Sequence, residues 1–164
     1  MIHDKDYILR IVKQFSEFLT KRILGESEET ISDQQRIFDT NMNDTFKMSF
    51  NELSSKSAEE ITQLIHQKES NHHIPYFELL GHLFYAKAKE IDNKDFSEKA
   101  IVFYQLYLQT SGIFSLPIIN RINEIKKALE TLTTIEFWCL CDEIGLEEKT
   151  PHTHIFIYSG KGIR

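Results

Sequence analysis

The chain has few of the residues that interrupt regular structure, since its 164 residues include only 6 glycines and 3 prolines. A sandwich or barrel of short strands needs many tight turns, and this composition supplies few of them. With 41% hydrophobic and 27% charged residues, the chain has the composition of an ordinary globular domain. These numbers exclude wholesale disorder and favour an all-α protein.

Cysteines and long apolar runs are also scarce. The two cysteines, Cys139 and Cys141, are separated by a single residue, which is too close for an ordinary disulfide. No segment approaches the roughly 20 consecutive apolar residues that span a membrane. Charged residues interrupt the apolar runs of residues 1–25, which is not typical of a signal peptide. We therefore expect a soluble, cytoplasmic protein.

Basic residues are fewer than acidic ones: 19 Lys or Arg stand against 25 Asp or Glu, which gives a net charge of -6. A general nucleic-acid binder needs a basic face that displaces the counterions of the phosphates, so this class is not expected. The deficit is uneven, since residues 1–25 carry five Lys or Arg against three Asp or Glu. A local basic patch is therefore compatible with the sequence, although neither a nucleic acid nor a membrane is the expected partner.

The first helix is predicted over residues 4–24. Asp4 or Asp6 can cap its start, and Gly25 suits the left-handed position after its end. Its apolar residues cover roughly 160° of the helical circumference, and the central stripe consists of Ile8, Val12, Phe15, Leu19 and Ile23. A stripe this broad predicts that two helices of the same chain flank it. Self-association into a homodimer and binding to a membrane surface are the alternatives.

Apolar residues at helical spacing predict further helices along most of the chain. In the first half they cover residues 29–41, a single turn at 50–53 and a short helix opened by a Ser57–Glu60 capping box. The segment KESNHH, with His72 and His73, is expected to be a loop with solvent-exposed side chains.

The second half is more apolar. A central helix is expected from Pro75, at a first helical position, to about Asn93. Asp95 and Glu98 can form the capping box of a following helix that ends at Gly112. From Ser115 to Leu132, isoleucines and leucines follow a 4-3-4-3 spacing that is typical of a coiled-coil-like seam.

The C-terminal tail, residues 133–164, has a different pattern. Its segments TTIEFWCLC and THIFIY are rich in β-branched and aromatic residues, so they could pair as a short β-hairpin. The first segment could instead prolong the preceding helix, which we favour because an isolated two-stranded ribbon is marginally stable. We accordingly divide the chain into a helical domain, residues 1–132, and a C-terminal tail, residues 133–164, for which both the helix and the hairpin are kept as alternatives.

The segment FYAKAKEIDNKDFSEKAIVFYQLYL, residues 84–108, is similar to one tetratricopeptide-type helical hairpin. Ala88 and Ala100 stand twelve residues apart, as the close contact of two such helices requires, and Tyr104 occupies an expected aromatic position. Tyr107 replaces the usual small residue. With DYILRIVKQFSEFL and FNELSSKSAEEITQLI, residues 6–19 and 50–65, the chain resembles an uncharacterised bacterial family of short tetratricopeptide-like proteins. The resemblance covers roughly residues 4–130 and implies an all-helical fold without an assigned enzymatic activity.

One group of residues in the tail has the chemistry of a metal site. Two thiols and two imidazoles, from Cys139, Cys141, His152 and His154, are the ligand set of a structural zinc site. Common zinc modules separate the cysteines by two to four residues, however, and on a helix Cys139 and Cys141 would diverge by about 200°. Buried thiols and exposed histidines are therefore the favoured interpretation, and no cofactor is expected.

These observations predict an all-α protein of about six helices, centred on a tetratricopeptide-like hairpin with the N-terminal helix packed across it. The expected function is a non-catalytic scaffold or adaptor that binds a protein or peptide. Such hairpins leave one face of their first helix open to ligands, and the candidate residues are Tyr76, Glu78, His82, Tyr85 and Lys89. A zinc-binding protein and a membrane-surface protein are the alternatives, in that order.

Overall fold

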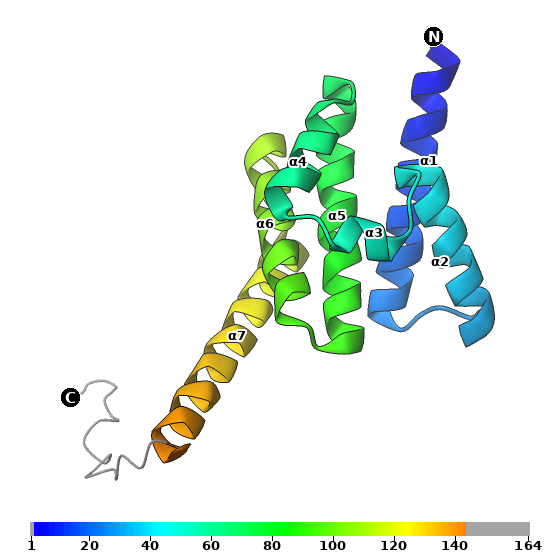
Figure 1. Ribbon diagram of the computed structural model, residues 1–164. Helices are drawn as coiled ribbons and strands as arrows, with labels where there is room; N and C mark the ends of the chain where they lie inside the picture. The colour runs from blue at the N-terminus through cyan, green and yellow to red at the C-terminus, as the bar shows by residue number, and fades with distance from the viewer. Residues whose placement is uncertain (1, 144–164) are drawn as a thin grey trace. The chain divides into compact units, whose positions relative to one another are not determined.

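The computed structural model describes the backbone of residues 2–143 and the side chains of residues 6–132. Regular structure in these residues is entirely helical, which confirms the all-α prediction (Figure 1). The helices are α1 (Ile2–Leu24), α2 (Ile31–Phe46), α3 (Phe50–Ser54), α4 (Ala58–His66), α5 (Ser70–Ile91), α6 (Lys94–Ser111) and α7 (Leu116–Glu143). The chain divides into two units, Met1–Ile125 and Lys126–Arg164.

In the first unit, α5 is the central helix. It packs against α6, which follows it in the chain, and against α1, which is far from it in sequence. Helix α1 also packs against α2. Helices α1 and α5 run in the same direction, whereas α2 and α6 run back along them (Figure 1). Helix α1 therefore packs alongside α5, the first helix of the pair α5–α6, rather than across both helices as the sequence predicted.

The broad apolar stripe of α1 is explained by this arrangement. Val12, Phe15 and Leu19 are buried, at 1%, 0% and 0% exposure. They are covered by α2 and α5, so the prediction of two flanking helices from the same chain is confirmed. Gly25 has a φ of 74°, and the amide of Glu26 donates to the carbonyl of Lys21 over 2.9 Å, which completes the expected C-terminal cap.

The predicted start of α1 is wrong. The helix begins at Ile2, so Asp4 and Asp6 lie inside it and neither residue is its N-terminal cap.

A continuous series of phenylalanine rings connects five of the helices. The Phe38 ring of α2 lies 5.7 Å from Phe15 and 6.0 Å from Phe50, and Phe50 lies 5.7 Å from Phe84. The series ends at Phe103 of α6, whose ring stacks on Phe84 at 5.9 Å. Edge-to-face pairs at these distances add to the free energy of burial. Helix α3 has only five residues, and its first residue supplies the ring that links α2 to α5.

The helix starts follow local side-chain chemistry. The Ser57 hydroxyl accepts a hydrogen bond from the amide of Glu60 over 3.1 Å, as the predicted capping box requires. The prediction that Asp95 caps α6 is wrong, because Asn93 accepts from the amide of Phe96 over 3.1 Å. Asp95 lies within the first turn instead, where its carboxylate accepts a 2.7 Å bond from Lys99. Asn93 and Asp95 can both cap a helix, and they are only two residues apart. Tertiary contacts therefore determine which of them begins α6.

The start of α5 also differs from the prediction. The helix begins at Ser70, so Pro75 lies inside it and the expected loop at residues 68–73 is partly helical. A proline close to a helix start removes one backbone hydrogen bond, and packing of the upstream turn can offset this cost. That turn carries His72, which is 2% exposed. The expectation of a solvent-exposed His72 is therefore wrong.

Helix α7 extends through Glu143, so the favoured helical continuation of the segment TTIEFWCLC is confirmed. The segment THIFIY lies outside the described residues. In the first unit, Ile118, Ile122 and Ile125 of the predicted seam are buried, at 3%, 6% and 6% exposure.

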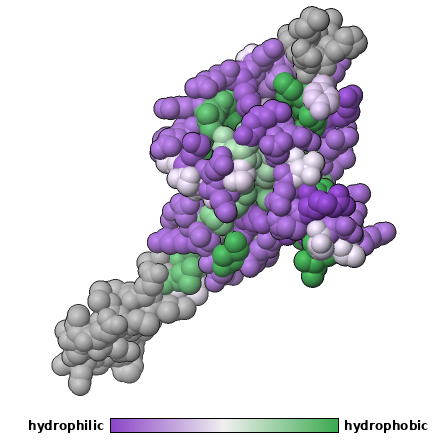
Figure 2. All heavy atoms as spheres, turned by 45° about the vertical axis from the view of Figure 1, so that its right-hand side comes forward, coloured by the Kyte–Doolittle hydropathy of each residue, from purple (hydrophilic) through white to green (hydrophobic). Residues whose placement is uncertain are grey.

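The face shown in Figure 2 is mostly hydrophilic, with separate hydrophobic areas. Large apolar side chains that remain exposed include Ile31 at 87% and Phe114 at 77%. Among residues 2–143, no helix has the length and hydropathy that crossing a lipid bilayer requires.

Candidate functional site

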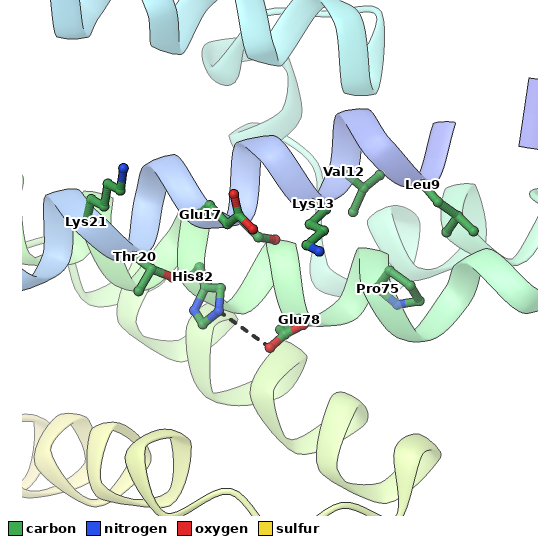
Figure 3. Close-up of a pocket in the computed structure, with 10 residues that line it drawn as sticks. Leu9, Val12, Lys13, Glu17, Thr20, Lys21, Pro75, Glu78 and His82 are labelled. Carbon is green, nitrogen blue, oxygen red and sulfur yellow. Dashed lines mark ion pairs between the residues drawn. The ribbon is translucent and has the colours of Figure 1, made fainter. Parts of the chain in front are cut away.

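A groove of about 640 Å³ runs along α1 and α5 (Figure 3). Its apolar residues are Leu9 and Val12 from α1 and Pro75 from α5. The lining of α1 continues to Lys21, twelve residues beyond Leu9, which corresponds to about 18 Å of helix. Because the two helices are parallel, Leu9 lies near Pro75 at one end, and Thr20 lies near His82 at the other. The groove therefore follows both helices for several turns.

Charged groups of both signs border the groove. Helix α1 contributes exposed Lys13, Glu17 and Lys21, and α5 contributes Glu78; the imidazole of His82 adds a polar group beside them. Nε2 of His82 lies 3.8 Å from a carboxylate oxygen of Glu78, and Figure 3 marks this pair with a dashed line. Apolar surface bordered by both signs of charge is suited to an amphipathic peptide rather than to a highly charged polymer.

His82 links the groove to a buried polar cluster formed with α6 and the first turns of α7. The Tyr104 hydroxyl lies 2.8 Å from Nδ1 of His82, and Nη1 of Arg121 lies 3.2 Å from each of these atoms. His82 is 6% exposed and Tyr104 is 0% exposed. An arginine can only donate hydrogen bonds, so the histidine nitrogen and the tyrosine oxygen are its acceptors. The cluster holds the His82 ring in a defined orientation at the groove.

A second cluster continues along the same face of α5. The Tyr85 hydroxyl donates to a carboxylate oxygen of Glu124 over 2.5 Å, and Lys89 donates to the other oxygen over 3.3 Å. The Tyr85 hydrogen bond lowers the pKa of the Glu124 carboxyl. Nζ of Lys89 and the Arg121 guanidinium lie 5.7 and 5.3 Å from the Tyr85 ring centroid. Tyr85 and Lys89 therefore contact α7, whereas Glu78 and His82 face the groove.

The sequence placed Tyr76 in the same set, but the structure places it on another face of α5. Tyr76 is 3% exposed, and its hydroxyl donates to the carbonyl of Thr45 over 3.2 Å. Its ring packs against Phe46 at 5.8 Å. Of the five predicted partner-binding residues, only Glu78 and His82 line the groove. Tyr85 and Lys89 contact α7, and Tyr76 contacts the end of α2.

All four predicted metal ligands lie outside residues 6–132, whose side chains the structure describes. Cys139 and Cys141 lie in the helical backbone of α7, and His152 and His154 lie beyond residue 143. Among residues 6–132, no three His, Cys, Asp or Glu side chains converge as ligands of a metal ion.

Gly81 and Arg121 also belong to this site, although the residue pattern did not predict a role for either. A methyl group at Gly81 would overlap the Tyr104 ring, so the absence of a side chain there allows α6 to approach α5 beside the groove. A single glycine inside an apolar helical segment is the signal that could have identified this close contact. Arg121 had no comparable signal, because it is a single charged residue on the polar side of a predicted helix.

Tyr76, Tyr85 and Tyr104 are three of the buried tyrosines, and we expect them to make the stability of the fold depend on alkaline pH. Burial raises the pKa of Tyr76 to about 12, and burial together with Glu124 raises the pKa of Tyr85 to about 12. Burial also raises the pKa of Tyr104. A folded-state pKa above the unfolded value stabilises the fold fully below the unfolded pKa, near 10, and the effect is lost as the pH rises toward 12.

We expect the free energy of unfolding to fall between pH 9 and pH 11, by roughly 1 kcal/mol for each fully buried tyrosine. Urea titrations at several pH values measure this fall, and tyrosinate absorbance shows that ionisation accompanies unfolding. Tyr76→Phe should reduce the pH dependence, although it also removes a hydrogen bond at every pH. A free energy of unfolding that stays constant to pH 11 would contradict the burial of these hydroxyls.

Comparison of the chain with protein-family models, with curated proteins and with solved structures finds no match.

Proposed function

We propose that the protein is a non-catalytic adaptor that binds an amphipathic peptide segment of another protein in the groove between α1 and α5. The observation that carries the proposal is the groove itself, with its apolar residues Leu9, Val12 and Pro75 and its border of both charge signs. Peptide helices bind such grooves by placing an apolar stripe on the floor and polar residues at the edges.

The arrangement of the helices supports this proposal. In tetratricopeptide-like proteins the first helices of successive hairpins lie side by side and form the ligand-binding surface. Here α1 and α5 are the first members of the pairs α1–α2 and α5–α6, and they are parallel neighbours. Glu78 and His82, two residues expected to contact a partner, lie on this surface.

The groove also suggests what the partner looks like. Its length of about 18 Å along α1 accommodates about three turns of helix. Ser16 in its middle and Thr20 toward the His82 end line it with small side chains, which allow close approach of a second backbone. We therefore expect a helical segment of about 12 residues, with apolar residues on one side and charges of both signs beside them.

Peptide selection with a blocked variant tests the proposal. A display library of amphipathic peptides of about 12 residues is selected on the full chain, and binding is then measured with Thr20→Trp, which fills the groove. Thr110→Trp is the matched control, because Thr110 is exposed on α6. We expect the selected peptides to lose at least about tenfold in affinity with Thr20→Trp and to be unaffected by Thr110→Trp.

Two results would count against the proposal. Peptides that bind the wild type and Thr20→Trp equally well would place the binding surface elsewhere. Failure to enrich any peptide, while both tryptophan variants remain folded by circular dichroism, would argue that the groove is not a peptide-binding surface.

A further inference from the structure

A second pocket, of about 350 Å³, lies on the other side of α1 from the groove residues. Ile8 and Ile11 of α1 contribute apolar surface to it, and Tyr76 of α5 contributes an aromatic ring. Thr45, at the end of α2, and Lys68, just after α4, complete much of its lining. A volume of this size is within the range of small-molecule sites.

Two lysines give the pocket a positive charge. Lys47 and Lys68 both line it. Nζ of Lys68 lies 4.8 Å from the Tyr76 ring centroid, and in the part of the chain with described side chains neither lysine forms an ion pair with a carboxylate. Burial, and in addition the charge of Lys47, lower the pKa of Lys68. The attraction of lysines to helix C-termini explains their position, but not why the partly buried Lys68 lines the same pocket as a second lysine.

The Thr45 hydroxyl is a second feature that points to a ligand. Thr45 is 4% exposed, and its hydroxyl oxygen has no hydrogen-bond partner. A threonine in a helix usually donates to the carbonyl one turn before it. Leaving a buried hydroxyl without a partner costs about 1–3 kcal/mol, which rotation of the Thr45 side chain toward a polar group bound in the pocket would recover.

The backbone at Lys47 supports the same interpretation. Lys47 has a φ of 60°, a left-handed conformation that favours glycine. An ordinary residue there costs about 1 kcal/mol relative to glycine. A lysine at this position therefore lowers the free energy of unfolding relative to glycine, and it places a cation at the pocket. This combination is expected when the side chain has a binding role.

We propose that this pocket binds a small organic anion, with a carboxylate or phosphate group beside Lys47, Lys68 and the Thr45 hydroxyl and an apolar body against Ile8, Ile11 and the Tyr76 ring. Asp44 also lines the pocket, and its exposed carboxylate opposes the bound anion. This opposition favours a ligand of low total charge over a polyphosphate. The proposal rests on residues distinct from those of the peptide groove.

Calorimetric titration of the full chain with hexanoate, hexyl phosphate and neutral hexanol tests this inference. We expect the anions to bind and hexanol to bind at least about tenfold more weakly, because charge-assisted hydrogen bonds to the lysines are absent from its complex. Whichever of the two anions binds more tightly identifies the preferred head group.

Variants with opposite expected effects make the test specific. Lys68→Met should weaken hexanoate binding by about tenfold, whereas Asp44→Asn should strengthen it a few-fold by removing the opposing charge. Lys47→Gly should weaken binding while raising the melting temperature, because it relieves the left-handed strain. Lys56→Met, at a lysine that does not line the pocket, is the matched control and should change neither property.

The inference is overturned if hexanol binds as tightly as hexanoate, if Lys68→Met has no effect, or if neither anion binds at concentrations up to about 10 mM. The groove variant Thr20→Trp should leave anion binding unchanged. Failure of the peptide proposal and failure of the anion proposal are therefore distinguishable.

Discussion

Phe15→Asp is expected to leave the chain unfolded or aggregated. Phe15 is 0% exposed, and its ring lies 5.7 Å from Phe38 in the series of phenylalanines that connects the helices. The substitution removes roughly 1.5–3 kcal/mol of burial and places a carboxylate in an apolar site, which costs several kcal/mol more. Since small domains have about 5–15 kcal/mol of stability in total, this loss is of the same size as the whole.

Circular dichroism and thermal unfolding measure this outcome. Phe114→Asp is the matched control, because Phe114 is 77% exposed and the same substitution there should leave the helical signal unchanged. If Phe15→Asp remained soluble, helical and as stable as the wild type, α1 would not be part of the core. The peptide groove, which needs α1 beside α5, would then be lost as well.

Gly81→Ala is expected to destabilise the fold although alanine is the better helix former. At a solvent-exposed position inside a helix, replacing glycine by alanine stabilises the helix by about 1 kcal/mol. Here the added methyl group would overlap the Tyr104 ring, which is fully buried. The Tyr104 hydroxyl is also hydrogen-bonded to His82 and Arg121, which restrains the ring. Relief requires α6 to move away from α5, so we expect a net loss of about 2–3 kcal/mol in the free energy of unfolding.

A double-mutant cycle with Tyr104→Leu identifies the cause of that loss. If the overlap with the ring is responsible, Gly81→Ala should cost much less when Tyr104 is already leucine. The measurement is urea denaturation of the four proteins. A higher midpoint for Gly81→Ala in the wild-type background would show that the two helices are not in close contact at this position.

Helix α1 shows which features of this protein can be predicted from local sequence. Its apolar stripe and Gly25 act within a few residues of one another, so they were interpretable without knowledge of the rest of the chain. Its start was not, because the helix begins at Ile2, before both of the predicted capping residues, Asp4 and Asp6. The Ser57 cap was predictable for the same reason. The starts of α5 and α6 were misplaced because Pro75 and Asp95 are each compatible with two positions near a helix start, and only tertiary packing distinguishes them.

The candidate sites were predictable only in part. Glu78 and His82 were identified because they lie on one face of a single helix, whereas Tyr76 was assigned to the same face and belongs to another. The remaining parts of both sites come from separate elements. The small residues of α1 in the groove, and Thr45 and Lys68 in the pocket, carry no signal until distant segments are packed together.

The sequence by itself determined that this chain forms amphipathic helices and approximately where most of them lie, because spacing and capping are local interactions. The tertiary structure decided that α1 lies parallel to α5, that Tyr104 packs onto Gly81, and that Lys47 and Lys68 face one pocket. The physical reason is that the free energy gained by burying an apolar surface does not depend on which segment of the chain covers it. An apolar stripe requires a cover, but the shape and charge of the other stripes determine which helix covers it.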